Sequence, residues 1–266
     1  MKKRFFTSES VTSGHPDKVC DYIADSILDE AIRQDPYSHM AVEATIKDDL
    51  ILVYGEANTK ADLDYEAIAL NAIREIGYKE EYHVEIKVNK QSAEINDAVA
   101  HDEISAGDQG IMFGYADDET EEYMPFAINC AHKLARQLEK VRREDARLMP
   151  DGKTQVTVEY DDGKLARIDA IVVSTQHTKD ITQEELHELI KEKVIDPIVD
   201  KKYIDENTKY LINPSGSFVL GGSWGDSGTT GRKIVVDTYG GYAPIGGGCF
   251  SSKDPTKVDR SAAYYA

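Results

Sequence analysis

The sequence has little cysteine, a single tryptophan, a deficit of basic residues and no long apolar run. Three cysteines without any CxxC pair provide neither a disulfide framework nor a zinc site, and they suit a reducing compartment. No apolar run reaches the roughly 20 residues that a membrane helix needs. The basic start MKKR is followed by only two apolar residues, so no signal-peptide core forms. These features predict a cytoplasmic protein.

Positive charge is scarce, because 31 lysine and arginine residues stand against 49 aspartate and glutamate residues, for a formal net charge of -18. Nucleic acids and anionic membranes are bound by broad basic faces, so we expect neither as a partner. The 266 residues, 41% of them hydrophobic, suffice for a sizeable core in one large or two ordinary domains.

Glycine and positive charge are instead concentrated near the end of the chain. More than half of the 19 glycines fall within residues 216–248. Nearby cations are Arg232, Lys233, Lys253, Lys257 and Arg260. Glycine lets backbone approach a ligand closely, and clustered cations in an acidic chain favour a polyphosphate, although glycine clusters also form ordinary turns. Residues 225–234, GDSGTTGRKI, lack the ending of a P-loop.

Hydrophobic spacing predicts one order of elements twice: helix, hairpin, helix, strand. The first copy comprises a helix at 16–35, a hairpin at 39–57 turning at 47–49, a helix at 62–78 with Asp62 as its cap and Gly77 near its end, and a strand at 81–90. The second comprises a helix at 124–144, a hairpin at 154–177 turning at 161–163, a helix at 182–200 and a strand at 208–214. We therefore expect an α+β fold with helices on one face of small mixed sheets.

Two segments stand outside this repeat. Residues 91–123 have little periodicity, and their first half is interpreted as a mobile loop of the kind that covers active sites, or as disorder without function. Residues 259–266, DRSAAYYA, begin a helix that indicates either the start of a third repeat or an ordinary frayed end.

Two short motifs combine charge with a backbone feature. Residues 14–18, GHPDK, place His15 and Asp17 at a helix start, where an anion is favoured. A carboxylate beside an anion site indicates a bridging Mg²⁺, or Asp17 simply caps the helix. Residues 150–153, PDGK, bring a carboxylate and a lysine to a strand start, or form a plain turn.

Together these stretches carry a family resemblance. The motifs are TSES (7–10), GHPDK (14–18), GE (55–56), QSAEI (91–95), AGDQGIMFGYA (106–116), PDGKTQVTVEYDDG (150–163), STQH (174–177), GDSGTTGRKIVVDTYGG (225–241) and GGGCFSSKDPTKVDRSAAY (246–264). In this order they resemble the S-adenosylmethionine synthetase (methionine adenosyltransferase) family. The resemblance covers the whole length, and several motifs exceed ten residues.

The resemblance implies a reaction in two steps. The sulfur of L-methionine attacks C5′ of ATP and displaces triphosphate, which is then hydrolysed to pyrophosphate and phosphate. It further implies Mg²⁺ and K⁺ as cofactors, and a homo-oligomer, dimeric or tetrameric, whose active sites are shared between two chains. The alternatives are a non-catalytic nucleotide-binding fragment or partner subunit of a complete synthetase, and, more distantly, an unrelated nucleotide-phosphate hydrolase.

Each role that the resemblance implies falls on a matching residue. Triphosphate-binding catalytic residues are His15, Lys153, Arg232, Lys233 and Lys253. The full ATP-binding set is His15, Asp108, Asp151, Gly152, Lys153, Ser217, Phe218, Asp226, Arg232, Lys233, Cys249 and Lys253, with Phe218 stacking on adenine and Asp108 and Asp151 at the ribose. Methionine ligands are Glu56, Gln91, Asp226 and Lys257. Metal ligands are Asp17 and Asp259 for Mg²⁺ and Glu43 for K⁺.

The resemblance also implies interleaved domains. The first repeat domain is 1–13 with 119–221, the second is 14–92 with 222–258, residues 93–118 are a gating loop and strand, and 259–266 are the stub of a third repeat. The chain departs from the family pattern at four positions and in length: Ser217 replaces arginine, Ile245 histidine, Cys249 alanine and Ser252 glycine, and most of the third repeat is absent.

Overall fold

The computed structural model describes residues 3–90 and 109–266, which form two compact units. Unit 1 comprises Met1–His15, Tyr115–Gly222 and Val235–Ala243, and unit 2 comprises Pro16–Gly114, Ser223–Ile234 and Pro244–Ala266. Each unit holds one four-stranded mixed sheet and its own hydrophobic core. The expected α+β class, with helices on one face of each sheet, is confirmed.

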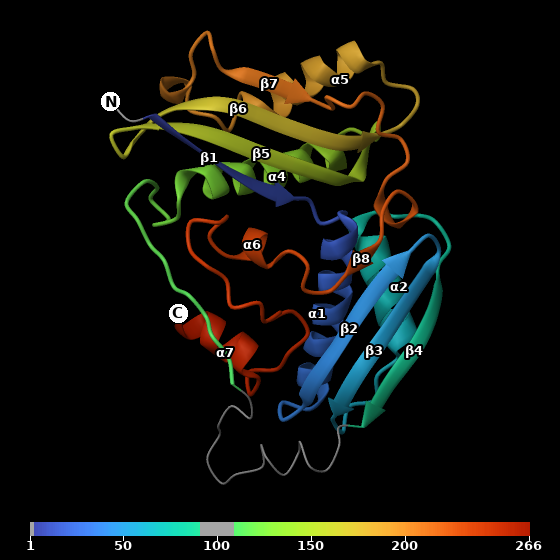
Figure 1. Cartoon of the computed structure of the whole chain (residues 1–266). Coiled ribbons are helices and arrows are strands. Elements are labelled where there is room, and N and C mark those ends of the chain that lie inside the picture. The colour runs from blue at the N-terminus through green and yellow to red at the C-terminus, as the bar shows by residue number, and fades with distance from the viewer. Residues whose placement is uncertain (1–2, 91–108) are drawn as a thin grey trace. The chain divides into compact units, whose positions relative to one another are not determined.

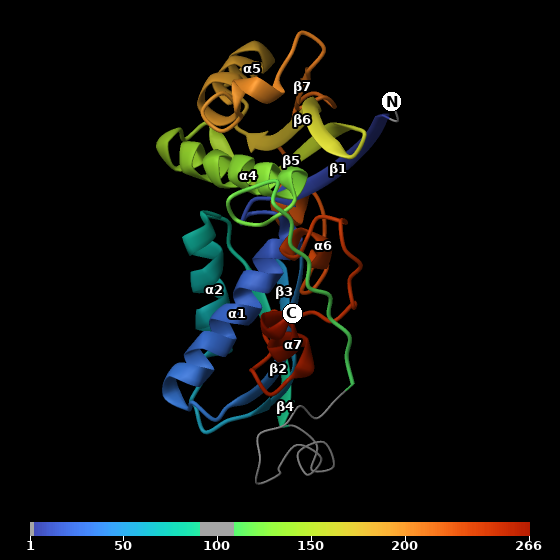
Figure 2. The same cartoon turned by 90° about the vertical axis from the view of Figure 1, so that its left-hand side faces the viewer.

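Unit 1 is built on a sheet with the strand order β1-β5-β6-β7. Its elements are β1 (Lys3–Val11), α4 (Phe126–Glu144), β5 (Leu148–Asp161), β6 (Lys164–His177), α5 (Gln183–Ile190), a π-helical turn (Lys191–Ile195), a short 3-10 helix (Lys201–Tyr203) and β7 (Lys209–Ile212). Helices α4 and α5 cover one face of the sheet (Figure 2), and their apolar side chains share one core with those of β5 and β6.

Unit 2 is built on a sheet with the strand order β4-β3-β2-β8. Its elements are α1 (Pro16–Gln34), β2 (His39–Lys47), β3 (Leu50–Asn58), α2 (Tyr65–Ile76), β4 (His83–Lys90), a 3-10 turn that begins at the unit boundary (Gly222–Trp224), β8 (Gly228–Thr229), α6 (Ile234–Asp237, at the other boundary) and α7 (Val258–Tyr265). Helices α1 and α2 pack on the same face (Figure 1) and enclose the second core with β2 and β3.

The two sheets have equivalent connectivity. In each, an antiparallel hairpin (β5–β6, β2–β3) is extended by a parallel strand after a helix (β7, β4) and by an antiparallel edge strand (β1, β8). The order helix, hairpin, helix, strand that the sequence predicts is therefore present in both units. None of the described helices is long and apolar enough to span a bilayer.

Local signals account for most of these elements. Both hairpins turn over two residues, with positive φ at Asp48 (50°), Asp162 (48°) and Gly163 (83°), the geometry that tight hairpins require. Gly77 ends α2 with φ of 116°, as expected. Asp62 as the α2 cap is wrong: Asp64 accepts from the Ala67 N–H at 2.9 Å instead.

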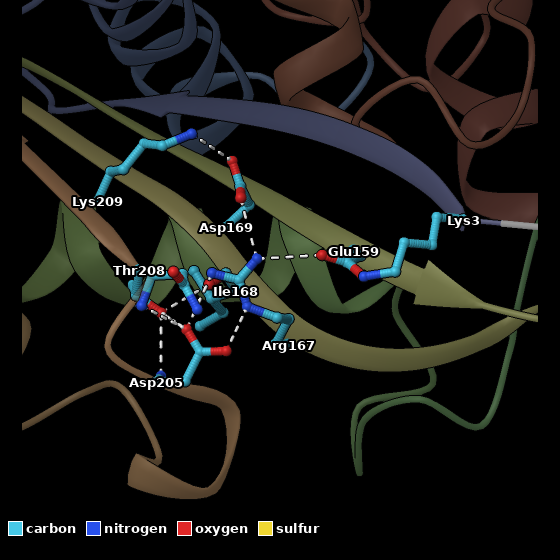
Figure 3. A network of polar contacts seen from close by, with 9 residues as sticks. Lys3, Glu159, Arg167, Ile168, Asp169, Asp205, Thr208 and Lys209 are labelled. Carbon is cyan, nitrogen blue, oxygen red and sulfur yellow. Dashed lines mark hydrogen bonds and ion pairs between the residues drawn. The ribbon is translucent and has the colours of Figure 1, made fainter.

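An ionic network crosses the sheet of unit 1 (Figure 3). Arg167 on β6 donates to Glu159 on β5 at 3.1 Å, to Asp169 at 2.9 Å and to Asp205, which precedes β7, at 2.8 Å. Lys3 on β1 pairs with Glu159, and Lys209 on β7 pairs with Asp169 at 3.3 Å. The network thus joins all four strands of this sheet.

Candidate active site

Three predicted site residues of unit 2 meet at the first turn of α1. The Lys233 ammonium lies 2.5 Å from one oxygen of Asp17, and the Arg232 guanidinium lies 3.8 Å from the other. The Thr229 N–H donates to Asp17 at 3.0 Å. Asp17 therefore holds both the backbone and the cations of the glycine-rich segment.

Tight backbone packing fixes this contact. A Cβ on Gly228 would lie 2.1 Å from the Pro16 carbonyl oxygen, so only glycine fits beside the helix start. Two residues later, the Thr230 N–H donates to the Ala44 carbonyl oxygen at 3.0 Å, and the Ala44 N–H donates to the Thr230 hydroxyl at 2.9 Å. Glu43, the predicted K⁺ ligand, directly precedes this pair on β2.

A second cation and carboxylate pair lies after the glycine run. Lys253 pairs with Asp259, the other predicted Mg²⁺ ligand. A Cβ on Gly248 would lie 2.0 Å from the Asp259 carboxylate, so this glycine makes room for it. The Lys253 backbone also bridges to Ala41 on β2. Both cationic stretches are thereby attached to unit 2 beside β2.

The predicted methionine ligands that lie in the described residues have no polar contact with one another. Glu56 is exposed on β3, Asp226 is exposed before β8, and Lys257 is the cap residue of α7. No hydrogen bond or ion pair joins these three to one another in the part of the chain that the structure describes. Gln91 and Asp108 lie outside the described residues, as does most of the expected gating loop; residues 109–118 contain no regular element.

Cys249 packs against the glycine that precedes Arg232. A Cβ on Gly231 would lie 2.5 Å from the Cys249 Cβ, and Gly231 has φ of 79°. Burial raises the pKa of the Cys249 thiol to about 11, so the thiol stays protonated at neutral pH. This side chain shapes the segment by packing.

In unit 1, β5 has a bulge at residues 149–151, where the PDGK motif begins. The register shifts between Leu148, which pairs with His177, and Gly152, which pairs with Thr175. The plain turn that Pro-Asp-Gly also suggested is therefore wrong. Lys153 follows the bulge, is exposed and pairs with Val11 at the end of β1. Bulges are common beside active sites, where they redirect a side chain.

Residues 12–15, which follow β1 and include the start of the GHPDK motif, pack directly on this bulge. The Thr12 N–H donates to the Gly152 carbonyl oxygen at 3.0 Å, and the Thr12 hydroxyl donates to that of Pro150 at 2.7 Å. A Cβ on Gly14 would lie 2.3 Å from the Pro150 backbone. His15, which is 3% exposed, follows this contact, so the loop and the bulge are held together.

The predicted adenine and ribose residues of unit 1 are braced by backbone contacts. The Phe218 N–H donates to His177 Nε2 at 3.0 Å, and the His177 N–H donates to the Phe218 carbonyl oxygen at 2.9 Å. Asp151 accepts from the Gly222 N–H at 2.8 Å. Ser217, beside Phe218, is exposed. His177, the last residue of the STQH motif, thus supports the backbone at Phe218, a role that the motif alone does not reveal.

The predicted Mg²⁺ ligands of unit 2, Asp17 and Asp259, are carboxylates, which supply the oxygen donors that Mg²⁺ prefers. The described residues contain no group of three His, Cys, Asp or Glu side chains placed to hold a metal ion. Mg²⁺ is usually held by one or two carboxylates together with substrate phosphates and water, so Asp17 and Asp259 with a polyphosphate would suffice. A hollow of about 700 Å³ elsewhere in unit 2, lined in part by His39 and Lys60, contains none of the predicted site residues.

Fold and site together define an α+β protein of two equivalent units, one of which pairs clustered cations with carboxylates beside a glycine-rich segment. Three family models match in order: the N-terminal domain of S-adenosylmethionine synthetase at residues 3–102, its central domain at 103–218 and its C-terminal domain at 220–266. The chain is 50% identical to S-adenosylmethionine synthase of Clostridium tetani over 99% of its own length, and 48% identical to that of Brachyspira hyodysenteriae over 100%.

The chain belongs to the S-adenosylmethionine synthetase family, whose members are methionine adenosyltransferases. It covers 73% of the length of each of these two relatives.

Proposed function

We propose that this chain synthesises S-adenosylmethionine from ATP and L-methionine and then hydrolyses the triphosphate to pyrophosphate and phosphate. The observation that carries the proposal is the pairing of Lys233 with Asp17 and of Lys253 with Asp259, in a chain that matches all three domains of the family. Such a cluster suits a multiply charged leaving group and its metal ions.

The first step of the reaction requires alignment of the methionine sulfur with C5′ of ATP and stabilisation of the charge on the triphosphate leaving group. The methionine sulfur forms a bond to C5′ while the C5′–O bond breaks, and the bonding electrons leave with triphosphate. A thioether carries no proton on sulfur, so this step needs no general base. His15, Lys153, Arg232, Lys233 and Lys253 would stabilise the negative charge that develops on the leaving oxygen and the phosphates.

The remaining roles follow the family assignment. Mg²⁺, held by Asp17 and Asp259, would supply further charge neutralisation, and K⁺ would lie at Glu43. Phe218 would stack on adenine, and Asp108 and Asp151 would bind the ribose. Glu56, Gln91, Asp226 and Lys257 would orient methionine, while Gly152, Ser217 and Cys249 would complete the ATP site. Nothing in this scheme requires a nucleic acid or a membrane.

The proposal includes an assembly and a compartment. Active sites would be shared between two copies of the chain, in a homodimer or homotetramer, and the reaction would take place in the cytoplasm. The interleaved repeats, 1–13 with 119–221 and 14–92 with 222–258, and the gate at 93–118 belong to the same proposal. Light scattering should give a dimer or larger species, and an active monomer would contradict shared sites.

The decisive assay supplies the chain with ATP, methionine, Mg²⁺ and K⁺ and measures S-adenosylmethionine and released phosphate. We expect both products, and Lys153→Met should reduce turnover at least about a hundredfold, the usual cost of losing a group that stabilises transition-state charge. Lys164→Met, at the other end of the same hairpin, is the matched control. A folded chain that binds ATP without forming product would instead favour the non-catalytic partner subunit, which the 73% coverage also accommodates.

A further inference from the structure

Helix α1 presents carboxylates at a four-residue spacing to the glycine-rich segment. Asp21 and Asp25 follow Asp17 by four and eight residues, so all three lie along one side of the helix. The Gly231 N–H donates to Asp21 at 2.9 Å, and the Ser252 N–H donates to Asp25 at 2.8 Å. Each of these carboxylates therefore holds backbone that is more than 200 residues away in the sequence.

The two backbone groups lie directly before the proposed triphosphate ligands. Gly231 precedes Arg232 and Lys233, and Ser252 precedes Lys253. A hydrogen bond at the preceding N–H fixes where the next side chain leaves the backbone. Glycine-rich backbone has more conformational freedom than other sequences, so contacts from outside the segment must fix its conformation. Charge-assisted bonds to carboxylates are strong enough to provide it.

Asp25 also holds the residue after Asp259. The Arg260 guanidinium lies 2.7 Å from Asp25, and its Nε donates to the Lys253 carbonyl oxygen at 3.1 Å. One carboxylate thus fixes the backbone before Lys253 and, through Arg260, the start of α7 that carries Asp259. This double contact places Lys253 and Asp259 next to each other.

Asp21 lies in a more enclosed position. It is 4% exposed, and Lys18, one turn earlier on α1, lies 3.1 Å from its second oxygen. Burial raises the pKa of Asp21, and the nearby Lys18 ammonium and Gly231 N–H partly offset this rise. One oxygen of this buried carboxylate therefore accepts the Gly231 N–H, and the other has the Lys18 ammonium as its ion-pair partner without a hydrogen bond in the part of the chain that the structure describes.

We propose that Asp21 and Asp25 are positioning residues of the triphosphate site, acting through Arg232, Lys233 and Lys253 without touching the substrate. This inference rests on the proposed function, because it assigns these three cations to triphosphate. The carboxylates organise the site before the ligand binds, so their loss should weaken triphosphate binding while the fold is retained.

The test measures binding of tripolyphosphate with Mg²⁺ to the full chain by calorimetry. Asp25→Ala should raise the dissociation constant at least tenfold. Asp25→Asn, which keeps an oxygen acceptor for the Ser252 N–H, should recover much of that loss. Asp29→Ala is the matched control, since Asp29 is exposed on α1 a further four residues on, and binding should stay within twofold of the unchanged chain.

Amide hydrogen exchange separates a local effect from a general loss of stability, because a general loss would accelerate exchange at core amides of α1 as well as at Ser252. Exchange at Ser252 should accelerate in Asp25→Ala, remain slow in Asp25→Asn and be unaffected in Asp29→Ala. If Asp25→Ala does not fold, Asp21→Ala and Arg260→Gln replace it, each with an expected severalfold loss of binding.

The outcomes separate the two proposals. If the unchanged chain binds tripolyphosphate and every Asp21, Asp25 and Arg260 variant binds equally well, the positioning role is wrong and the triphosphate site stands. If the unchanged chain does not bind tripolyphosphate, the proposed function fails, and the positioning role fails with it.

Discussion

Ser252 stands where the family pattern has glycine, and its backbone has a conformation that favours glycine. Its φ of 69° lies in the left-handed region, which costs a residue with a Cβ roughly 1–2 kcal/mol. The side chain is fully buried, and its hydroxyl has no hydrogen-bond partner among the described residues. The chain therefore carries local strain directly beside Lys253.

We expect Ser252→Gly to raise the free energy of unfolding by about 1–2 kcal/mol, because it removes both the strained Cβ and the buried hydroxyl. Urea unfolding measures the change. Ser251→Gly is the matched control: its φ is not positive, so glycine should lower stability by roughly 0.5–1 kcal/mol through backbone entropy. Equal effects of the two substitutions would show that the left-handed backbone at 252 stores no strain.

At the scale of elements, the Arg167 network gives the sheet of unit 1 a dependence on pH. Lys3 and Arg167 hold the pKa of Glu159 below its usual value, and Arg167 does the same for Asp169 and Asp205. Carboxyls with a lowered folded pKa stabilise the fold above their unfolded pKa of about 4, and this contribution is lost as the pH falls through the folded pKa.

Arg167→Met should therefore lower the urea midpoint at pH 7, and its difference from the unchanged chain should shrink as the pH falls below about 4. Arg143→Met is the control, because the Arg143 side chain is 63% exposed and its ion pair with Glu139 should contribute little. A difference that stays constant from pH 7 to pH 3 would exclude the network as the cause.

The sequence predicted the elements well where the signal is local. The three-and-four spacing in α1, the two-residue hairpin turns and Gly77 depend on neighbours within a few residues. Asp64 rather than Asp62 caps α2 because the helix begins at Tyr65, while the Asp62 backbone is held outside it by Gln34 of α1, a contact at 3.0 Å that no local pattern reveals. The two-residue strand β8 is too short for any periodicity to detect.

The candidate site was predictable only through its motifs. Long motifs indicated the proposed triphosphate cations and the two carboxylates proposed for Mg²⁺, and the structure joins Lys233 to Asp17 and Lys253 to Asp259. Asp21 and Asp25 read as ordinary polar positions on an amphipathic helix. Their acidic four-residue spacing was visible, but their partners lie more than 200 residues later, so sequence alone gave no reason to single them out.

For the molecule as a whole, these ion pairs link two ligands. The Asp17 carboxylate, which is proposed to bind Mg²⁺, forms an ion pair with the Lys233 ammonium, which is proposed to bind triphosphate. Either ligand alone must break the pair and leave one charge without its partner, whereas both together satisfy both charges. Mg²⁺ and polyphosphate should therefore strengthen each other's binding to the same extent, as linkage requires.

Lys233→Met tests this coupling with Mn²⁺ as a spectroscopic probe. Without the ammonium, Asp17 should bind Mn²⁺ alone about tenfold more tightly, a change of about 1.4 kcal/mol, while tripolyphosphate binding weakens. Lys47→Met, which removes an exposed pair with Asp48, should change neither affinity. Unchanged binding of Mn²⁺ to Lys233→Met would contradict the exchange of partners.

The regular spacing of the carboxylates on α1 sets the positions of distant backbone groups in the glycine-rich segment. A helix advances about 1.5 Å and turns about 100° per residue, so Asp17, Asp21 and Asp25 lie about 6 Å apart along one side. One residue inserted between Asp21 and Asp25 would swing Asp25 about 100° away from Ser252. Insertions and deletions that surface loops tolerate should therefore be absent from residues 17–25 in relatives that carry the same glycine-rich segment.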